Sequence, residues 1–347
     1  MDCIIPHHSV RMFCAAIGAC SKIGKDLYVD FDAIDGLCLR TLNEAKSAYV
    51  CYKFHPTFFA RCTAPSLEIL ETSRKRKNRS QQSTADSDED DNGTTTTNDE
   101  PRFSCRLAIK ALAAAVRQRK NVQSLRLYVE QVASSLHLSF EYLLAPAALL
   151  DEDNGSTTCW RVVHRVPVAD FPVAVVSAVA SATGASEMVV APRTLCRLLE
   201  PLARQAETAW MIPSPAREEQ MVATCFQHQA AGAASNHNAL WTSHLQTEMR
   251  LSYDDLDEME FVDNRDDDQD EDMPDNVNES VVLVFSHREA KSILSWAASA
   301  EHLACPSVRV LFHWGGRPVV LRQETNDWKV ELVLATLDHK ILGTMNE

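Results

Sequence analysis

Residues 3–31 read CIIPHHSVRMFCAAIGACSKIGKDLYVDF, and this stretch holds a complete strand, helix and strand. Apolar runs at 3–5 and 26–31 predict the strands, and apolar residues at helical spacing predict a helix over 9–22 between them. The same unit occurs four times in the chain. Its further helices are predicted at 108–119, 194–205 and 287–300, and its further strands at 103–107, 123–129, 188–191, 207–212, 281–285 and 307–312. This repetition indicates two duplicated halves with two helices each.

The segments between these units read as antiparallel hairpins. Their strands are predicted at 36–42 with 47–54, 136–143 with 159–166, and 317–322 with 329–334. The fold class is therefore α+β, with two similar domains that each combine two helices with antiparallel sheets. A doubly wound nucleotide-binding fold is excluded, because it needs parallel crossovers and the chain has no Gly-x-Gly-x-x-Gly.

The formal net charge of −14 is confined to two polar segments. Residues 254–275 hold thirteen acids against Arg265 alone, a net of −12, and residues 73–100 hold seven acids and five bases, a net of −2. The rest of the chain is neutral overall, so the total charge does not exclude a nucleic-acid partner. Segments this poor in apolar residues cannot offset the entropy of ordering, so we predict disordered insertions at 73–100 and 254–278.

The domain organisation follows from the duplication. We predict an N-terminal domain over 1–178, a connector of small residues over 179–187 and a C-terminal domain over 188–347.

The eleven cysteines lie mostly inside apolar runs, and none forms a Cys-x-x-Cys pair. We expect reduced thiols in an intracellular protein. The first residues lack a basic segment followed by a hydrophobic core, and no uncharged apolar stretch approaches the roughly 18 residues of a membrane helix. A soluble protein without a membrane partner is therefore expected.

Each predicted helix has one apolar stripe and an opposite face of bases and small residues, and Glu200 and Glu289 are the only acids within the four helices. If the helices share one side of the sheets, they form a basic surface that follows phosphates without reading bases. The candidate DNA-facing residues are Arg11, Lys22, Lys110, Arg117, Arg119, Lys120, Arg193, Arg197, Arg204, Arg288 and Lys291. The alternative is that these are ordinary solvated helix residues.

Three blocks of sequence carry a family resemblance. The first contains IGKDLYV at 23–29, DGLCLRTLN at 35–43, SAYVC at 47–51 and FHPTFF at 54–59. The second is residues 188–199, and the third begins with SWAASA at 295–300 and continues through the closing strands to 337. Together they resemble the Rad-nine family, the largest subunit of the nine-one-one checkpoint clamp.

This resemblance implies the sliding-clamp fold of proliferating cell nuclear antigen and a ring of three different subunits around duplex DNA. The implied partners are Rad-one and Hus-one type clamp subunits, a clamp loader, double-stranded DNA, and repair and checkpoint proteins. The implied location is the nucleus. The basic run Arg74, Lys75, Arg76 and Lys77 is either a nuclear import signal or a solvated turn.

Two other functions stay open. One is a homotrimeric replication-type clamp, although such clamps are compact and lack long polar insertions. The other is a metal-dependent nuclease built on the acids of 254–275, which lack the apolar residues that would hold carboxylates in place around metal ions. We predict no catalytic residues, no metal site and no cofactor.

Overall fold

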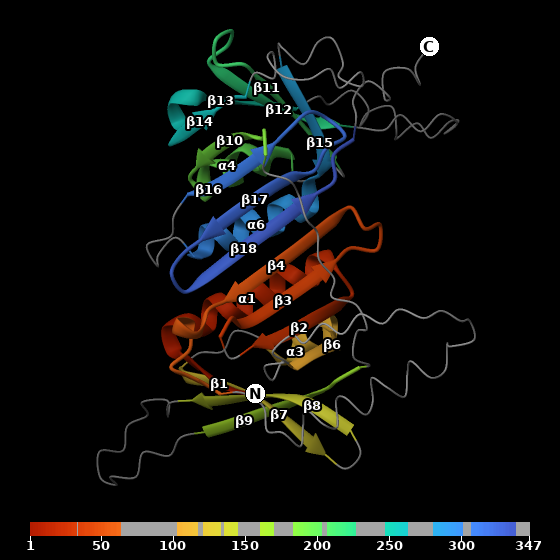
Figure 1. Cartoon of the computed structure of the whole chain (residues 1–347), viewed down its shortest axis with the longest axis vertical. Coiled ribbons are helices and arrows are strands. Elements are labelled where there is room, and N and C mark those ends of the chain that lie inside the picture. Colours follow the sequence, from red (N-terminus) through yellow and green to blue (C-terminus); the bar gives the residue numbers. More distant parts are fainter. Residues whose placement is uncertain are drawn as a thin grey trace, which may run out of the picture. The chain divides into compact units, whose positions relative to one another are not determined.

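The computed structural model describes residues 1–32, 34–63, 103–116, 121–132, 135–144, 160–169, 183–202, 207–226, 247–262, 280–300 and 307–337 (Figure 1). The chain divides into two compact units. The first comprises residues 1–42, 51–177 and 326–329, and the second comprises 43–50, 178–325 and 330–347. This grouping divides strand β4 after Val50 and strand β18 after Lys329.

The first unit contains two helices and nine strands in its described residues. They are β1 (Asp2–Pro6), α1 (His7–Ile23), β2 (Asp26–Asp32), β3 (Gly36–Leu42), β4 (Ala48–Phe54), the 3-10 turn η1 (Pro56–Phe58), β5 (Arg61–Thr63), β6 (Phe103–Ala108), α3 (Ile109–Ala115), β7 (Val122–Val132), β8 (Ser135–Leu144) and β9 (Trp160–Pro167).

The second unit repeats this order. It contains β10 (Ser186–Val190), α4 (Pro192–Leu199), the 3-10 turn η2 (Glu200–Leu202), β11 (Glu207–Pro213), β12 (Gln220–Phe226), β13 (Glu248–Ser252), the 3-10 turn η3 (Tyr253–Asp255), β14 (Glu258–Glu260), β15 (Ser280–Ser286), α6 (His287–Ala300), β16 (Val308–Phe312), β17 (Val319–Glu324) and β18 (Trp328–Leu334). The predicted duplication is therefore confirmed element by element.

Strand pairing is also duplicated. In the first unit β1 pairs antiparallel with β7 and β2 with β6. In the second unit β10 pairs with β16 and β11 with β15 in the same way. In each unit, a strand of one strand–helix–strand copy therefore pairs with a strand of the other copy. In the first unit, α1 contacts β1, β3 and β7, and α3 contacts β6 and β9.

Each unit has two groups of hydrogen-bonded strands. The first unit has the orders β5-β1-β7-β8-β9 and β4-β3-β2-β6, and the second has β14-β10-β16-β17-β18 and β13-β12-β11-β15. The predicted α+β fold with two helices and antiparallel strands in each half is confirmed. No helix among the described residues is long and apolar enough to span a membrane.

Aromatic side chains fill the cores beneath the helices. In the first unit the ring of Phe54 lies 5.4 Å from that of Phe13 and 4.6 Å from that of Phe58, measured between centroids. In the second, Trp210 and Phe285 meet edge to face at 4.9 Å. Burying one large apolar side chain stabilises a fold by roughly 1.5–3 kcal/mol, so these clusters hold the helices in place.

Two helices are shorter than predicted. The helix expected over 194–205 becomes α4 and η2, because Pro201 has no N–H to continue the α-helical hydrogen bonds. The helix expected over 108–119 ends at Ala115, where the next residue, Val116, leaves the helical conformation with ψ at 51°.

The acidic segment is not wholly an insertion. Its first nine residues, 254–262, are part of the fold, since β14 pairs with β10 and places Met259 opposite Met188. Glu258 and Glu260 are exposed on this strand. One apolar residue between two acids reads as a polar run, which is why the sequence did not reveal a strand. The remaining residues 263–278 and the whole of 73–100 lie outside the described part of the chain.

Two further expectations need correction. Ser186 and Glu187, assigned to the connector, begin strand β10. Cys3 and Cys62 form a disulfide, so the expectation that all cysteines are free thiols is wrong. These two residues lie directly opposite each other on β1 and β5, a pairing hidden in the sequence by their separation of 59 residues.

Candidate nucleic-acid interface

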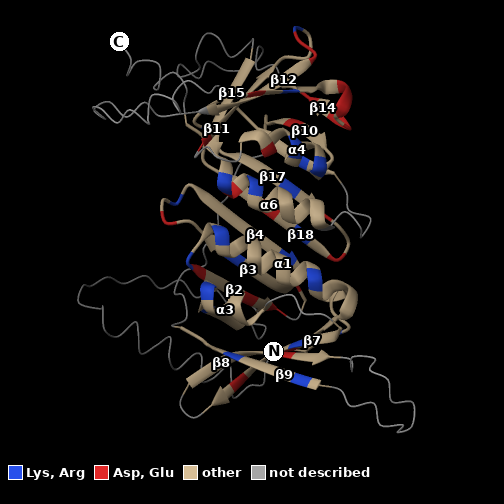
Figure 2. Cartoon of the chain, turned by 180° about the vertical axis from the view of Figure 1, so that it is seen from behind, with Lys and Arg blue, Asp and Glu red and all other residues tan. Residues whose placement is uncertain are grey.

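The two helices of each unit lie together on one face of its strands. Helices α1 and α3 contact each other, α1 packs against β3, and α3 packs against β6. Helices α4 and α6 also contact each other. Figure 2 shows Lys and Arg residues along the helices of each pair, and the exposed ones lie on the side of the helix turned away from its buried stripe. The candidate interface is this face, one in each unit.

In α1 the predicted stripe of Val10, Phe13, Ile17 and Cys20 is buried, as expected from its spacing. The opposite side exposes basic residues near both ends of the helix, Arg11 and Lys22. Between them Ala15 and Gly18 are half-buried, and a Cβ at Gly18 would meet nothing within 4 Å. The middle of this face therefore carries only small residues, with free space beside Gly18.

Helix α3 starts beside the end of α1, because the Ile109 N–H donates to the Lys25 carbonyl at 3.0 Å. Its inner side buries Ile109 and Leu112, and its outer side exposes Lys110 and Ala114. Lys110 thus joins Arg11 and Lys22 on the helical side of the first unit.

In the second unit α4 exposes Arg193 and Arg197, and α6 exposes Arg288 and leaves Lys291 half-exposed. Leu195, Leu198 and Leu199 of α4 are buried, and so are Ile293, Leu294 and Ala297 of α6. The basic faces predicted for α4 and α6 are therefore exposed, while their apolar stripes pack inward.

Acids barely offset this charge. Glu200 is exposed at the end of α4. Glu289 is 9% exposed, and its carboxylate accepts a hydrogen bond from the Ser286 hydroxyl at the start of α6. The spacing Ser-x-x-Glu is that of a helix capping box, so Glu289 serves the helix end rather than the outer face.

Basic residues on the strands differ from those on the helices in one respect, which is pairing. Strand arginines lie against carboxylates: Arg40 with Asp30, Arg61 and Arg126 with Asp2, Arg161 with Glu141, Arg165 with Glu130, Arg250 with Glu248, Arg309 with Glu187 and Arg322 with Glu331. Arg11, Lys22, Lys110, Arg197 and Arg288 form no ion pair with any carboxylate in the described residues. Positive charge is neutralised locally at these strand arginines and left open at these five helix residues within the described part of the chain.

His287 is a residue that the sequence did not single out. It begins α6, is 2% exposed, and neither of its ring nitrogens has a hydrogen-bond partner among the described residues. Burial, and secondarily the charge of Lys291, lower the pKa of this imidazole below 6.5. His287 is therefore neutral near pH 7 and adds no charge to the face.

Several candidates lie outside the described residues. They are the DNA-facing candidates Arg117, Arg119, Lys120 and Arg204, and the basic run Arg74, Lys75, Arg76 and Lys77. Within the described part of the chain, no three His, Cys, Asp or Glu residues are grouped as metal ligands.

Solved structures with a similar fold are sliding clamps. Proliferating cell nuclear antigen of Thermococcus kodakaraensis matches with a TM-score of 0.57 and 12% identity, over 96% of this chain and 99% of that chain. The antigen of Entamoeba histolytica matches with a TM-score of 0.57 and 8% identity, over 96% and 98%. That of A. fulgidus, solved with the C-terminal region of FEN-1 bound, matches with a TM-score of 0.52 and 12% identity, over 96% and 97%.

These similarities establish the sliding-clamp fold predicted from the sequence. The family is established separately, because the family model of Rad9 matches residues 13–143 and 164–337. That match covers most of both units, with all of α3, α4 and α6 and residues 13–23 of α1. The chain belongs to the Rad9 family.

Proposed function

We propose that this protein is a non-enzymatic subunit of a heterotrimeric ring that encircles double-stranded DNA at damage sites and serves checkpoint and repair factors as a platform. The observation that carries the proposal is the contrast in pairing between helix and strand bases. Open charge on a surface of small residues suits phosphates, whose attraction is long-range and independent of base sequence. Such contacts hold a duplex loosely enough for sliding.

The exposed sheet edges support assembly with other subunits. Strands β9 and β13 each lie at the edge of their strand order, and an edge strand leaves backbone N–H and C=O groups open for another chain. Trp160 at the start of β9 is 66% exposed. Since β9 and β13 differ in sequence, a contact between such edges is head-to-tail, and head-to-tail contacts close into rings when the rotation permits.

The partners we propose are Rad-one and Hus-one type clamp subunits, a clamp loader, and checkpoint and repair proteins, and the proposed location is the nucleus. Membership in the Rad9 family supports these partners. The basic run at 74–77 supports nuclear import.

The homotrimeric clamp is the nearest alternative, and likeness to proliferating cell nuclear antigen favours it. Mixing this chain with the two candidate subunits and measuring the mass in solution distinguishes the two. We expect a one-to-one-to-one trimer that binds duplex DNA. A stable trimer of this chain alone would contradict the proposal.

The nuclease alternative has its own test. The assembled ring is incubated with DNA and Mg²⁺, with and without replacement of Asp266, Asp267 and Asp268 by Asn. We expect no cleavage in either case. Mg²⁺-dependent cleavage that the triple substitution removes would assign a catalytic role to the acidic segment.

A further inference from the structure

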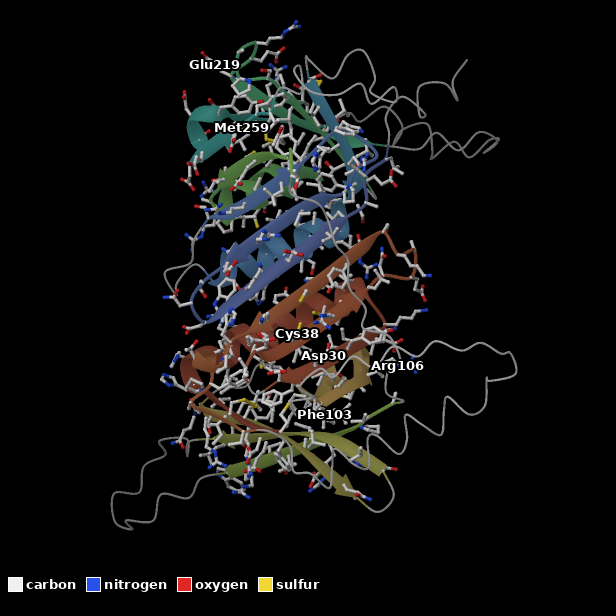
Figure 3. All side chains as sticks on the ribbon, viewed as in Figure 1. Asp30, Cys38, Phe103, Arg106, Glu219 and Met259 are labelled. Carbon is white, nitrogen blue, oxygen red and sulfur yellow. A yellow bond between two sulfur atoms is a disulfide. The ribbon has the colours of Figure 1, made fainter. Side chains whose placement is uncertain are left out.

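Two thiols meet on the face of the first unit that lies away from the helices. Cys38 of β3 and Cys51 of β4 place their Sγ atoms 3.2 Å apart, on strands that are neighbours in the sheet. Both residues belong to the first unit and both are partly exposed. Figure 3 labels Cys38 on this sheet.

Alternation along the strands fixes this face. Leu37 and Leu39 flank Cys38 and are buried, and Val50 and Tyr52 flank Cys51 and are buried. Because side chains alternate between the faces of a strand, the two sulfur atoms project away from the core that these neighbours form. Small molecules in solution can therefore reach the thiol pair, whereas Cys20 and Cys105 are fully buried.

The pair is already close to the geometry of a bond. Their Sγ atoms are already in contact at 3.2 Å, and bond formation brings two sulfur atoms to about 2.05 Å. Hydrogen bonding with Cys51, followed by burial, raises the pKa of Cys38.

We propose that Cys38 and Cys51 form an oxidation site that closes to a disulfide when the protein meets a hydroperoxide. The thiolate of one of the two cysteines attacks one peroxide oxygen, the O–O bond breaks, and hydroxide leaves with that cysteine as a sulfenic acid. The sulfur of the other cysteine then attacks the sulfenic sulfur, the S–O bond breaks, and water leaves with the proton of that second thiol. Two thiols and one hydrogen peroxide thus give one disulfide and two waters.

The consequence is a covalent link between β3 and β4. The first unit then has two such cross-strand links, since Cys3 and Cys62 already join β1 to β5. In the second unit, Met188 and Met259 lie at the strand positions that match Cys3 and Cys62. The Cys3–Cys62 disulfide and the proposed Cys38–Cys51 disulfide therefore both belong to the first unit.

The test uses the full chain, reduced, exposed to one or two equivalents of hydrogen peroxide, alkylated and mapped by peptide mass spectrometry. We expect a linked peptide pair containing Cys38 and Cys51, and no such pair in Cys38→Ser. Cys105→Ser is the matched control, since it removes a buried thiol of the same unit and leaves the link intact. Cys38 and Cys51 both recovered as free thiols, or either of them recovered as a stable sulfenic or sulfinic acid without the link, would overturn the proposal.

A second measurement does not depend on oxidation. Phenylarsine oxide condenses with two neighbouring thiols and releases one water, and it binds single thiols weakly. In the Cys62→Ser background, which lacks the neighbouring pair Cys3 and Cys62, we expect the reduced chain to lose affinity for this probe by at least tenfold in either Cys38→Ser or Cys51→Ser, and to keep it in Cys105→Ser. Equal affinity in all variants would show that the two sulfur atoms do not act together.

Discussion

The guanidinium of Arg126 donates from Nε and Nη2 to the two carboxylate oxygens of Asp2, at 2.8 and 2.7 Å. The second unit has the same pair, with Arg309 Nη1 2.9 Å from Glu187 Oε1 at the matching strand positions. The duplication thus extends from the order of elements to individual ion pairs. It breaks at the neighbouring edge strand, where Arg61 faces Ile4 in β1 and Glu258 faces Val189 in β10.

Asp2→Asn should destabilise the first unit by about 1 kcal/mol, the usual size of a partly exposed ion pair with charge-assisted hydrogen bonds. Hydrogen bonding from Arg126 lowers the pKa of Asp2 below 3.8. The stabilisation is therefore present above about pH 3.8 and is lost as the pH falls through the lower, folded-state pKa. Urea unfolding at pH 7 and at pH 3 measures it.

Asp35→Asn is the matched control for this substitution. Asp35 pairs with Lys53, but its side chain is 68% exposed, and we expect no measurable change in unfolding free energy. A loss at pH 7 as large for Asp35→Asn as for Asp2→Asn would contradict a special contribution of the Arg126 pair.

His287→Ile should stabilise the second unit by about 1–3 kcal/mol, because it removes a buried imidazole without hydrogen-bond partners. The matching first residue of α3 in the first unit is Ile109, which is fully buried, so the fold accepts this side chain there. The change fills the same place with apolar atoms.

The pH dependence of this variant has a defined sign. Because the folded-state pKa of His287 lies below 6.5, the unfolded chain takes up the proton first as the pH falls. The wild type should lose stability between about pH 7 and pH 5, and His287→Ile should lose less. Thermal unfolding at both pH values measures this, with the exposed His8→Ile as control. An identical loss in wild type and His287→Ile would contradict it.

The sequence predicted the helices most accurately where nothing interrupts their apolar spacing. The range 287–300 matches α6, and 9–22 lies within α1. Exposure of Arg11, Lys110, Arg197 and Arg288 also followed from helical spacing. Helical periodicity is local information, so it survives without knowledge of the fold.

Features that depend on strand register could not be predicted. The pairing of Cys3 with Cys62 and of Met188 with Met259 requires the alignment of strands from distant parts of the chain. The ion pairs of the strand arginines have the same origin, as Arg126 and Asp2 are 124 residues apart. The contrast between paired strand bases and open helix bases therefore appears only in the structure.

Cys62→Ser should lower the unfolding free energy by up to about 4 kcal/mol, the value expected for opening a loop of about 60 residues. The disulfide with Cys3 stabilises mainly by restricting the unfolded chain. Urea unfolding with and without dithiothreitol measures the effect. The reductant should weaken the wild type and Cys225→Ser, a cysteine of the second unit, and leave Cys62→Ser unchanged. Equal sensitivity of Cys62→Ser to the reductant would contradict the assignment.

Neutralising bases on the helices should weaken DNA binding by the assembled ring more than neutralising the same number on the strands. Arg197→Gln with Arg288→Gln removes two open charges from α4 and α6, whereas Arg309→Gln with Arg322→Gln removes two that already lie against Glu187 and Glu331.

Each phosphate that a base neutralises releases counterions and contributes about 0.9 to the slope of log affinity against log salt concentration. The helix pair of substitutions should therefore reduce this slope by up to about 2, and the strand pair should leave it unchanged, when duplex binding is titrated at several salt concentrations. Sizing chromatography of each variant checks that the ring still assembles. Because both variants lose the same formal charge from the same unit, equal slopes would mean that the ring responds only to its total charge, and the helix faces would lose their role as the DNA-facing surface.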